Sequence, residues 1–246
     1  MLFRSGSLGF IGPVSVRPDF WDKGVAKQLV AAAVAFLDEA GIRQSALFTF
    51  AGSPKHIALY QKFGFWPQYL TLVMTKDVVA AGGTAAWSRF STLTPAAQTR
   101  CLEQCRDITE QIFPGLSLAA EIRSIADLRL GETVLVNDGG GLAGFACCHA
   151  GSGTEAGSGM AYVKFGAVRP GVGAPEAFAR LLDACEAFAV EAGCGNLMAG
   201  VNAARHQAYR QMLDRGFRIL VSGVTMLRPD APAFNGPDCF VIDDLR

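Results

Sequence analysis

The chain has 246 residues, enough for one large domain or two of ordinary size. Basic and acidic residues number 22 each, so the formal charge is zero and no global field attracts nucleic acid or anionic lipid. Half of the residues are apolar and 18% are charged, which excludes the composition of disordered chains. We therefore expect two folded domains and neither a nucleic-acid nor a membrane partner.

The composition also indicates a location. No apolar run reaches the roughly 18–20 residues that cross a bilayer. The first residues are interrupted by Gly6, Gly9 and Gly12, which makes a poor signal peptide. Seven cysteines form an odd set without a CxxC pair or a histidine at metal-ligand spacing. These features predict a cytoplasmic protein with free thiols and no metal site.

An internal repeat organises the chain. Residues 16–41 and 168–193 have equal length, both begin with Val-Arg-Pro and both end with Glu-Ala-Gly. The same offset of 152 residues superposes Gly64-Phe65 on Gly216-Phe217 and Met74 on Met226. Self-similarity of this kind means that one supersecondary unit is used twice. We call residues 16–76 the first repeat and residues 168–228 the second repeat.

The first repeat reads as alternating strands and helices. Apolar residues recur at 3.6-residue spacing from Val25 to Leu37, and Gly41 follows in the usual position after a helix. Short β-rich runs bounded by glycine or proline indicate strands. The predicted order is strand Phe10–Val16, helix from Val25, strand Ala46–Phe50, short helix Pro54–Phe63 and strand Tyr69–Lys76.

The segment between the repeats differs in character. Asp77–Ala86 contains two glycines and several alanines and is a plausible linker, which places the domain boundaries at residues 1–80 and 86–246. Beyond it the pattern predicts helices Pro95–Phe113 and Leu118–Leu128, a hairpin around residues 138–141 and a flexible loop over 151–159.

The second repeat follows the same order as the first. We predict strand Tyr162–Val168, helix Glu176–Ala192, strand Leu197–Val201, a helix ending at Arg215, strand Ile219–Leu227 and a last strand within residues 238–246.

The loop from Val16 to Ala26 carries the clearest chemical signal. A strand runs into a glycine-containing turn that opens directly into a helix. The first N–H groups of a helix have no intrahelical partner and lie at the positive end of its dipole, so they bind anions. Gly24 permits close approach to the backbone, Ala26 leaves room, and Lys23 and Lys27 add charge. The loop is predicted to bind a phosphate group.

These residues resemble a known family. Val16, Pro18, Gly24 and Ala26 form the pattern V-x-P-x(5)-G-x-A, and Ser53, Tyr60 and Gly64-Phe65 follow at the matching distance. This set is similar to the GNAT superfamily of acyl-CoA-dependent N-acyltransferases, and two copies resemble a tandem GNAT protein. The resemblance covers residues 1–76 and 86–230. It implies an α/β fold of two tandem units with mixed central sheets, of which the N-terminal unit lacks its first strands and helices.

The resemblance also implies roles for residues. Backbone amides would hold the CoA pyrophosphate, the strand around Val14 and Val16 would pair with the pantetheine arm, and one strand amide would polarise the thioester carbonyl. Tyr60 would protonate the departing thiolate, and Ser53 replaces the asparagine that is frequent there. His56 is a further candidate base. The implied activity is acetyl transfer from acetyl-CoA to a primary amine of a small molecule or peptide, by direct attack. The implied pyrophosphate-binding positions are Trp21, Asp22, Lys23, Gly24, Val25 and Ala26.

The second repeat departs from this pattern. Pro175, Glu176 and Phe178 stand where the first repeat has Lys23, Gly24 and Ala26, so a carboxylate and a bulky ring replace small or basic residues. Counting back from Gly216 makes Met212 the counterpart of Tyr60, whereas counting forward from Asn202 selects Tyr209. We expect the first repeat to bind acyl-CoA and the second to be degenerate, a scaffold or substrate wall.

The first repeat is short on its N-terminal side. Met1 is interpreted as an internal methionine of a longer chain; alternatively, the second repeat or a partner subunit of a homodimer supplies the missing wall, because a half-sheet exposes a strand edge. Two other functions remain open: a non-catalytic acyl-CoA-binding sensor or interaction module, and a purely structural protein without a ligand.

Overall fold

The first repeat folds in the predicted order. The computed structural model describes residues 2–78 and 86–244, so most of the expected linker, Asp77–Ala86, lies outside the described residues. An N-terminal strand that we did not predict, β1, forms a hairpin with β2. The elements are β1 (Leu2–Ser5), β2 (Leu8–Ile11), η1 (Pro18–Phe20), α1 (Val25–Glu39), β3 (Gln44–Phe50), α2 (Pro54–Gln61) and β4 (Trp66–Asp77).

The predicted strand Phe10–Val16 is wrong in its extent. The strand that forms is β2, Leu8–Ile11, and residues 12–17 are not in a strand. Gly12 and Pro13 end it, since proline has no N–H to donate to a ladder.

The rest of the chain contains the predicted helices, hairpin and second repeat. The segment 151–159, expected to be a flexible loop, is a turn over residues 152–156, with Gly151 at the end of β7 and residues 157–159 at the start of β8; within the turn the Thr154 hydroxyl donates to Gly151 O over 2.8 Å. The elements are β5 (Ser88–Arg89), η2 (Phe90–Thr92), α3 (Pro95–Ile112), α4 (Ala119–Leu128), β6 (Gly131–Asp138), β7 (Gly141–Gly151), β8 (Gly157–Val168), α5 (Ala174–Glu191), β9 (Asn196–Asn202), α6 (His206–Asp214), β10 (Arg218–Arg228) and β11 (Val241–Ile242).

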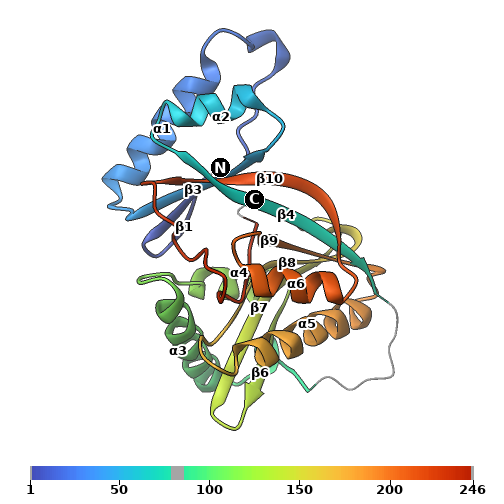
Figure 1. Cartoon of the computed structure of the whole chain (residues 1–246). Coiled ribbons are helices and arrows are strands. Elements are labelled where there is room, and N and C mark those ends of the chain that lie inside the picture. Colours follow the sequence, from blue (N-terminus) through green and yellow to red (C-terminus); the bar gives the residue numbers. More distant parts are fainter. Residues whose placement is uncertain (1, 79–85, 245–246) are drawn as a thin grey trace.

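The strands form one continuous mixed sheet rather than a sheet for each unit (Figure 1). Its order is β1-β2-β3-β10-β4-β9-β8-β7-β6-β5, with β11 added to β8. Only two pairs within the described residues are parallel, β2 with β3 and β8 with β9. The expectation of two central sheets is therefore corrected.

The cause is a reciprocal exchange of strands. The last strand of the second repeat, β10, lies between β3 and β4 of the first repeat. The last strand of the first repeat, β4, lies in turn between β10 and β9. Each repeat thus places its last strand between two strands of the chain's other repeat. The three central strand pairs, β3 with β10, β10 with β4 and β4 with β9, therefore all join one repeat to the other.

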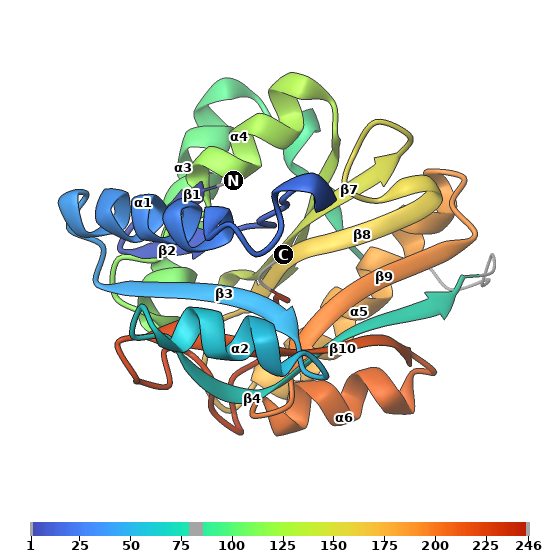
Figure 2. The ribbon, with the colours of Figure 1, turned by 90° about the horizontal axis from the view of Figure 1, so that it is seen from above.

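Helices cover both faces of this sheet. Helices α1 and α2 lie over β2 and β3 (Figure 2), where Leu37, Phe65 and Met226 are buried. Helices α5 and α6 cover the same side of the second repeat with a larger core that includes Phe178 and Leu182. Helices α3 and α4 pack on the opposite side over β6, β7 and β8.

Three properties bear on function. No helix in residues 2–78 and 86–244 is both long and apolar enough to cross a membrane. The same residues contain no group of three or more His, Cys, Asp or Glu side chains that could hold a metal ion. All seven cysteines are free thiols, and six of them are buried.

Candidate functional site

The loop between β2 and α1 has the backbone of an anion site. After the 3-10 turn Pro18–Phe20, Asp22 has φ +59° and Gly24 has φ +76°, and α1 begins at Val25. The left-handed conformation at Gly24 favours glycine, and a Cβ placed there would meet no atom within 4 Å. The loop therefore turns sharply while leaving the space in front of Gly24 open.

The amides at the start of α1 are available to a ligand. The first helical hydrogen bond runs from Gln28 N–H to Gly24 O over 3.1 Å. Within the described part of the chain, no acceptor is found for the N–H groups of residues 22–27. Since Trp21, Asp22, Lys23 and Gly24 are exposed, these donors face water. Six adjacent N–H groups at the positive end of a 15-residue helix suit a diphosphate.

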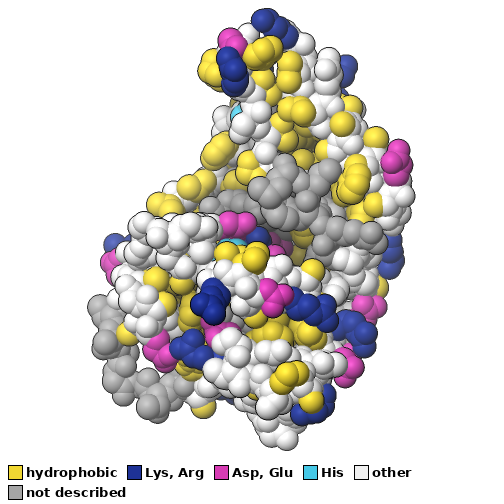
Figure 3. Space-filling view, turned by 180° about the vertical axis from the view of Figure 1, so that it is seen from behind, with side chains coloured by type: hydrophobic (Ala, Val, Ile, Leu, Met, Phe, Trp, Pro, Cys, Tyr) yellow, Lys and Arg dark blue, Asp and Glu magenta, His cyan; other side chains and the backbone are white. Residues whose placement is uncertain are grey.

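Basic side chains surround this loop. Lys and Arg side chains lie at the tip of the narrow upper part of the molecule (Figure 3), which Figure 1 shows to be this loop. Lys23 lies 5.3 Å from the centre of the Phe20 ring, and Lys55 at the start of α2 pairs with Asp22 over 3.1 Å. Lys27 is exposed one turn into α1. The positive charge is local, because the whole chain is neutral.

Strands β2 and β3 stop pairing before β3 ends. Their parallel pairing ends at Ile11 opposite Leu47, whereas β3 continues to Phe50, and we call the stretch beyond this last pair, where the two backbones no longer bond, the opening. Val14–Val16, which we expected to be a strand, lies in the loop that follows β2. The Trp21 indole donates to Val16 O over 2.8 Å, so one carbonyl of the segment is already used. The sequence did not reveal this contact.

Tyr60 lies on the same side of the sheet as the loop. It packs with Val14 and Ile57 onto the core beneath α1 and α2, and its ring meets Phe65 edge-on at 6.5 Å. Burial raises the pKa of Tyr60 above its usual value, so the phenol is neutral at physiological pH. Its hydroxyl makes no hydrogen bond to any described residue. A neutral, unpaired phenol is free to donate to a ligand.

The other candidate residues of α2 are less specific. Ser53 is the N-cap of α2 and its hydroxyl makes no capping bond, while its carbonyl accepts from His56 and Ile57 N–H. His56 is exposed. The structure thus packs Val14 and Tyr60 against the core that also holds Ala33 and Leu37 of α1, and places His56 on the surface.

The second repeat has lost the corresponding loop. Helix α5 begins at Ala174, three residues before the counterpart of the start of α1, and Glu176 is exposed in its first turn. Phe178 does not lie where a phosphate would bind: its ring is buried and stands 5.4 Å from the ring of Phe240. The loss therefore comes from a longer helix and a refilled core, not from a ring that blocks the loop.

The alignment of α6 with α2 is settled by the sheet. The pairing of β4 with β9 and of β10 with β3 repeats at an offset of 152 residues, without a gap. At this offset the counterpart of Tyr60 is Met212, which is fully buried, and not Tyr209. The second repeat therefore has no phenol at this position.

Fold and loop together define a class: the chain has the GNAT acetyltransferase fold. The sequence model of the acetyltransferase (GNAT) family matches residues 2–65, which include the loop and Tyr60. No curated protein matches the sequence significantly.

Solved structures match over nearly the whole chain. A candidate acetyltransferase from Pyrococcus horikoshii has a TM-score of 0.69 at 12% identity over 99% of this chain and 73% of its own. A GCN5-related N-acetyltransferase from Sphaerobacter thermophilus has a TM-score of 0.59 at 16% identity, covering 92% and 75%. A tandem GNAT protein from the clavulanic acid biosynthesis pathway has a TM-score of 0.55 at 14% identity, covering 90% and 75%. At these identities the similarity establishes the fold.

Proposed function

We propose that this chain is a tandem GNAT protein whose first repeat binds acetyl-CoA and transfers the acetyl group to a primary amine of a small molecule or peptide. The observation that carries the proposal is the row of unpaired amides from Asp22 to Lys27 in front of Gly24. The GNAT model matches residues 2–65, which contain this loop, and so supports the same assignment.

The first repeat fits the parts of the cosubstrate. The pyrophosphate would accept hydrogen bonds from the amides of residues 22–26, since the Trp21 amide, which we also expected to contribute, donates to Pro18 O over 3.1 Å. Lys23 and Lys27 are exposed on the same loop and helix start and would add positive charge. The pantetheine arm would lie along Val14–Val16, where the strand ladder has ended and N–H groups remain free. The thioester would then enter the opening beside β3.

Tyr60 is assigned the role of general acid. The amine nitrogen attacks the thioester carbonyl, the carbon–sulfur bond breaks, and the phenol gives its proton to the departing sulfur. The amine loses one proton, and the tyrosinate is reprotonated from water. An alkyl thiol has a pKa near 8.5 and a phenol about 10, and burial raises the pKa of Tyr60 further, so the transfer is uphill by about 2 kcal/mol or more and is driven by the breaking of the carbon–sulfur bond. Ser53, at the start of the same helix, can donate or accept one further hydrogen bond.

The second repeat serves as scaffold in this proposal. Its helix α5 starts early and carries Glu176 in the first turn, and its helix α6 has Met212 where the first repeat has a phenol. It contributes β10 to the centre of the first repeat's sheet and so supports the wall behind the opening.

Calorimetry with acetyl-CoA tests the proposal. Gly24→Glu should abolish measurable binding, because it adds a carboxylate at the phosphate position. Gly41→Glu is the matched control: it lies at the other end of α1, has φ +66°, and likewise has no atom within 4 Å of its Cβ. Equal affinity of the two variants, or no binding by the wild-type chain, would exclude the proposal.

A non-catalytic acyl-CoA-binding protein is the alternative. It is favoured by one observation: within residues 2–78 and 86–244, no carboxylate or imidazole hydrogen-bonds to Tyr60. Binding that persists without release of free CoA over a panel of amines would support it, as would an unchanged rate in Tyr60→Phe.

A further inference from the structure

The C-terminal segment Phe240–Asp244, which we call the tail, lies inside the second repeat. The parallel pairing of β8 with β9 ends at Val163 opposite Ala199, as that of β2 with β3 ends at Ile11 opposite Leu47. Beyond this point β8 pairs with β11 of the tail. On the other side, Asp243 N–H donates to Gly200 O of β9 over 2.9 Å. The tail thus bridges the two strands where they separate.

The tail occupies the positions that the cosubstrate would take in the first repeat. Residues 166–168 of β8 are the counterparts of Val14–Val16, to which we assign the pantetheine arm. Val241 and Ile242 pair with Ala167 and Gly166, and Val168 N–H donates to Phe240 O over 3.4 Å. In the second repeat, the tail therefore bonds to the backbone of residues 166–168, whereas the N–H groups of their counterparts in the first repeat, residues 14–16, have no backbone partner among the described residues.

One buried arginine holds the tail. Arg205, the counterpart of Ser53, is 1% exposed. Its guanidinium donates to Val241 O over 3.1 Å and to Asp243 O over 3.3 Å, and its Nε donates to the Asn235 side chain over 3.1 Å. A charge is buried at such a place only when hydrogen bonds replace its water, and the tail carbonyls supply two of them.

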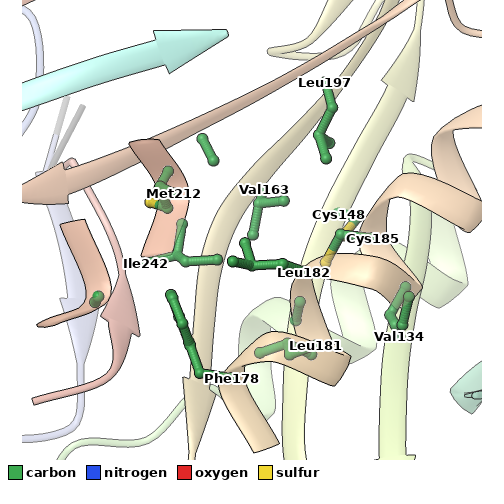
Figure 4. Close-up of a cluster of buried hydrophobic side chains, with 14 of the residues drawn as sticks. Val134, Cys148, Val163, Phe178, Leu181, Leu182, Cys185, Leu197, Met212 and Ile242 are labelled. Carbon is green, nitrogen blue, oxygen red and sulfur yellow. The ribbon is translucent and has the colours of Figure 1, made fainter. Parts of the chain in front are cut away.

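Apolar contacts complete the fit. Ile242 is fully buried and points toward Val163, Phe178 and Met212 (Figure 4). Phe178 and Met212 are the counterparts of Ala26 and Tyr60. The two side chains that replace the small residue and the phenol of the first repeat therefore pack in the same buried cluster as Ile242 of the tail.

A glycine makes room for the end of the tail. A Cβ on Gly200 would lie 2.2 Å from Asp244 Cβ, so the close approach requires glycine. The counterpart in the first repeat is Phe48, whose ring instead lies over Gly223 of the neighbouring strand β10.

We propose that the tail is a built-in occupant of the second repeat's cofactor groove, which takes the place of a pantetheine arm and excludes acyl-CoA from that repeat. The naming of the groove rests on the proposed function of the first repeat. The tail consequently limits each chain to one bound acyl-CoA.

Amide hydrogen exchange tests this directly on the wild-type chain. The amides of Val241–Asp243 should exchange as slowly as those of central strand β9, with and without saturating acetyl-CoA. Exchange at the rate of an unstructured peptide, or acceleration by acetyl-CoA, would overturn the proposal. Slow exchange in a chain that binds no acetyl-CoA at all would exclude the proposed function but would still show that the tail occupies the groove. A failure of the proposed function can therefore be told apart from a failure of this inference.

Variants give a second measurement. Arg205→Met, which keeps an unbranched apolar stem but removes the donors of the side chain, should accelerate exchange of Val241–Asp243 about tenfold or more. Arg210→Met, an exposed arginine of α6, the helix that Arg205 precedes as N-cap, is the control and should change nothing. Identical exchange in the two variants would contradict the proposal.

Native mass spectrometry measures the occupancy. We expect one acetyl-CoA for each wild-type chain and none in Gly24→Glu. A bound acetyl-CoA that survives in Gly24→Glu would place it in the second repeat and overturn the inference. If Arg205→Met does not fold, this stoichiometry and the wild-type exchange rates decide.

Discussion

Thr71 and Gly223 occupy the same position in the two repeats, 152 residues apart, and they lie directly opposite each other on β4 and β10. A residue can face its own counterpart only on a two-fold axis, so an approximate two-fold axis of the repeats passes between these strands. The row across the sheet continues from Gly223 to Phe50 and from Thr71 to Asn202, again a pair of counterparts. The axis explains why both strand exchanges occur together.

The first prediction concerns this axis. A Cβ on Gly223 would lie 2.1 Å from the Phe48 ring, so Gly223→Ala must displace a ring that packs beside β10. Overpacking of this kind costs about 1–3 kcal/mol. Urea unfolding should show a lower midpoint with an unchanged slope.

Gly195→Ala is the control for this substitution. A Cβ there would meet no atom within 4 Å, and the glycine does not have positive φ. Equal stability of the Gly223→Ala and Gly195→Ala variants would show that the ring can move aside freely.

The sequence was sufficient for the local structure of the repeats. The spacing of Val25, Leu29 and Leu37 and the glycine at 41 predicted α1, and the 152-residue offset aligned every helix and strand of the second repeat with the first. These signals are local, because they depend on helical periodicity and on turn residues. The predicted GNAT fold is confirmed.

The order of the strands was not predictable in this way. Nothing in the period-two pattern of β10 distinguishes pairing with β4 of the other repeat from pairing within its own repeat, since both bury the same face. The expectation of separate sheets failed for this reason. The early end of β2 was missed although Pro13 signals it, because the apolar residues Val14 and Val16 continue the alternation.

In the candidate site, too, the features that depend on local sequence were predicted and the tertiary contacts were not. The open turn at Gly24 and the position of Tyr60 follow from local sequence, whereas the hydrogen bond from Trp21 to Val16 O and the occupation of the second groove are tertiary contacts. The assignments of Tyr60, Ser53 and the loop to catalysis and cofactor binding stay predictions.

The second prediction tests Tyr60 as acid. Tyr60→Phe removes only a hydroxyl that makes no hydrogen bond to the described residues, so the midpoint of unfolding should stay within experimental error. The rate of CoA release with a reactive amine should fall about 100-fold or more. A drop in stability with an unchanged rate would assign Tyr60 to packing.

The pKa of Tyr60 adds a pH dependence. Burial raises this pKa in the folded state, so the unfolded chain ionises first as pH rises. Wild type and Tyr60→Phe should be equally stable below pH 9, and the wild type should become the less stable of the two as pH passes the usual tyrosine value near 10. A wild type that becomes more stable than Tyr60→Phe above pH 10 would contradict the direction of this shift.

The third prediction concerns acid stability on the α4 side. Burial acts to raise the pKa of Glu121, but the hydrogen bond with His149 at 3.2 Å and the charge of Lys164 at 3.5 Å outweigh it, and the pKa is lowered. A carboxyl with a lowered folded pKa stabilises the fold above its unfolded pKa, and this stability is lost as pH falls through the folded value.

Glu121→Gln should therefore flatten the loss of stability below about pH 4.5. Glu103→Gln, on the exposed face of α3, is the control and should leave the wild-type profile unchanged. Urea titrations at pH 3 to 7 measure the free energy of unfolding of both variants. Identical pH profiles for Glu121→Gln and wild type would show that Glu121 does not contribute to acid stability.

The fourth prediction uses the thiols as probes of the tail. Burial raises the pKa of Cys239, which directly precedes the tail, but among the seven cysteines it alone is partly exposed rather than buried. Cys147, in the core of β7, has its pKa raised far more strongly by complete burial. Since the thiolate is the reactive form, a native chain should show one slow reacting thiol, and Cys239→Ser should remove it.

The rate of that reaction reports on the neighbouring strand. In Arg205→Met the tail is less firmly held, so Cys239 should react faster with a maleimide, while Arg210→Met should match the wild-type rate. Mass spectrometry of the labelled peptides identifies the modified residue. Labelling of Cys147 or Cys185 before Cys239 in the folded chain would show that the core beneath α5 opens more readily than the tail leaves its groove.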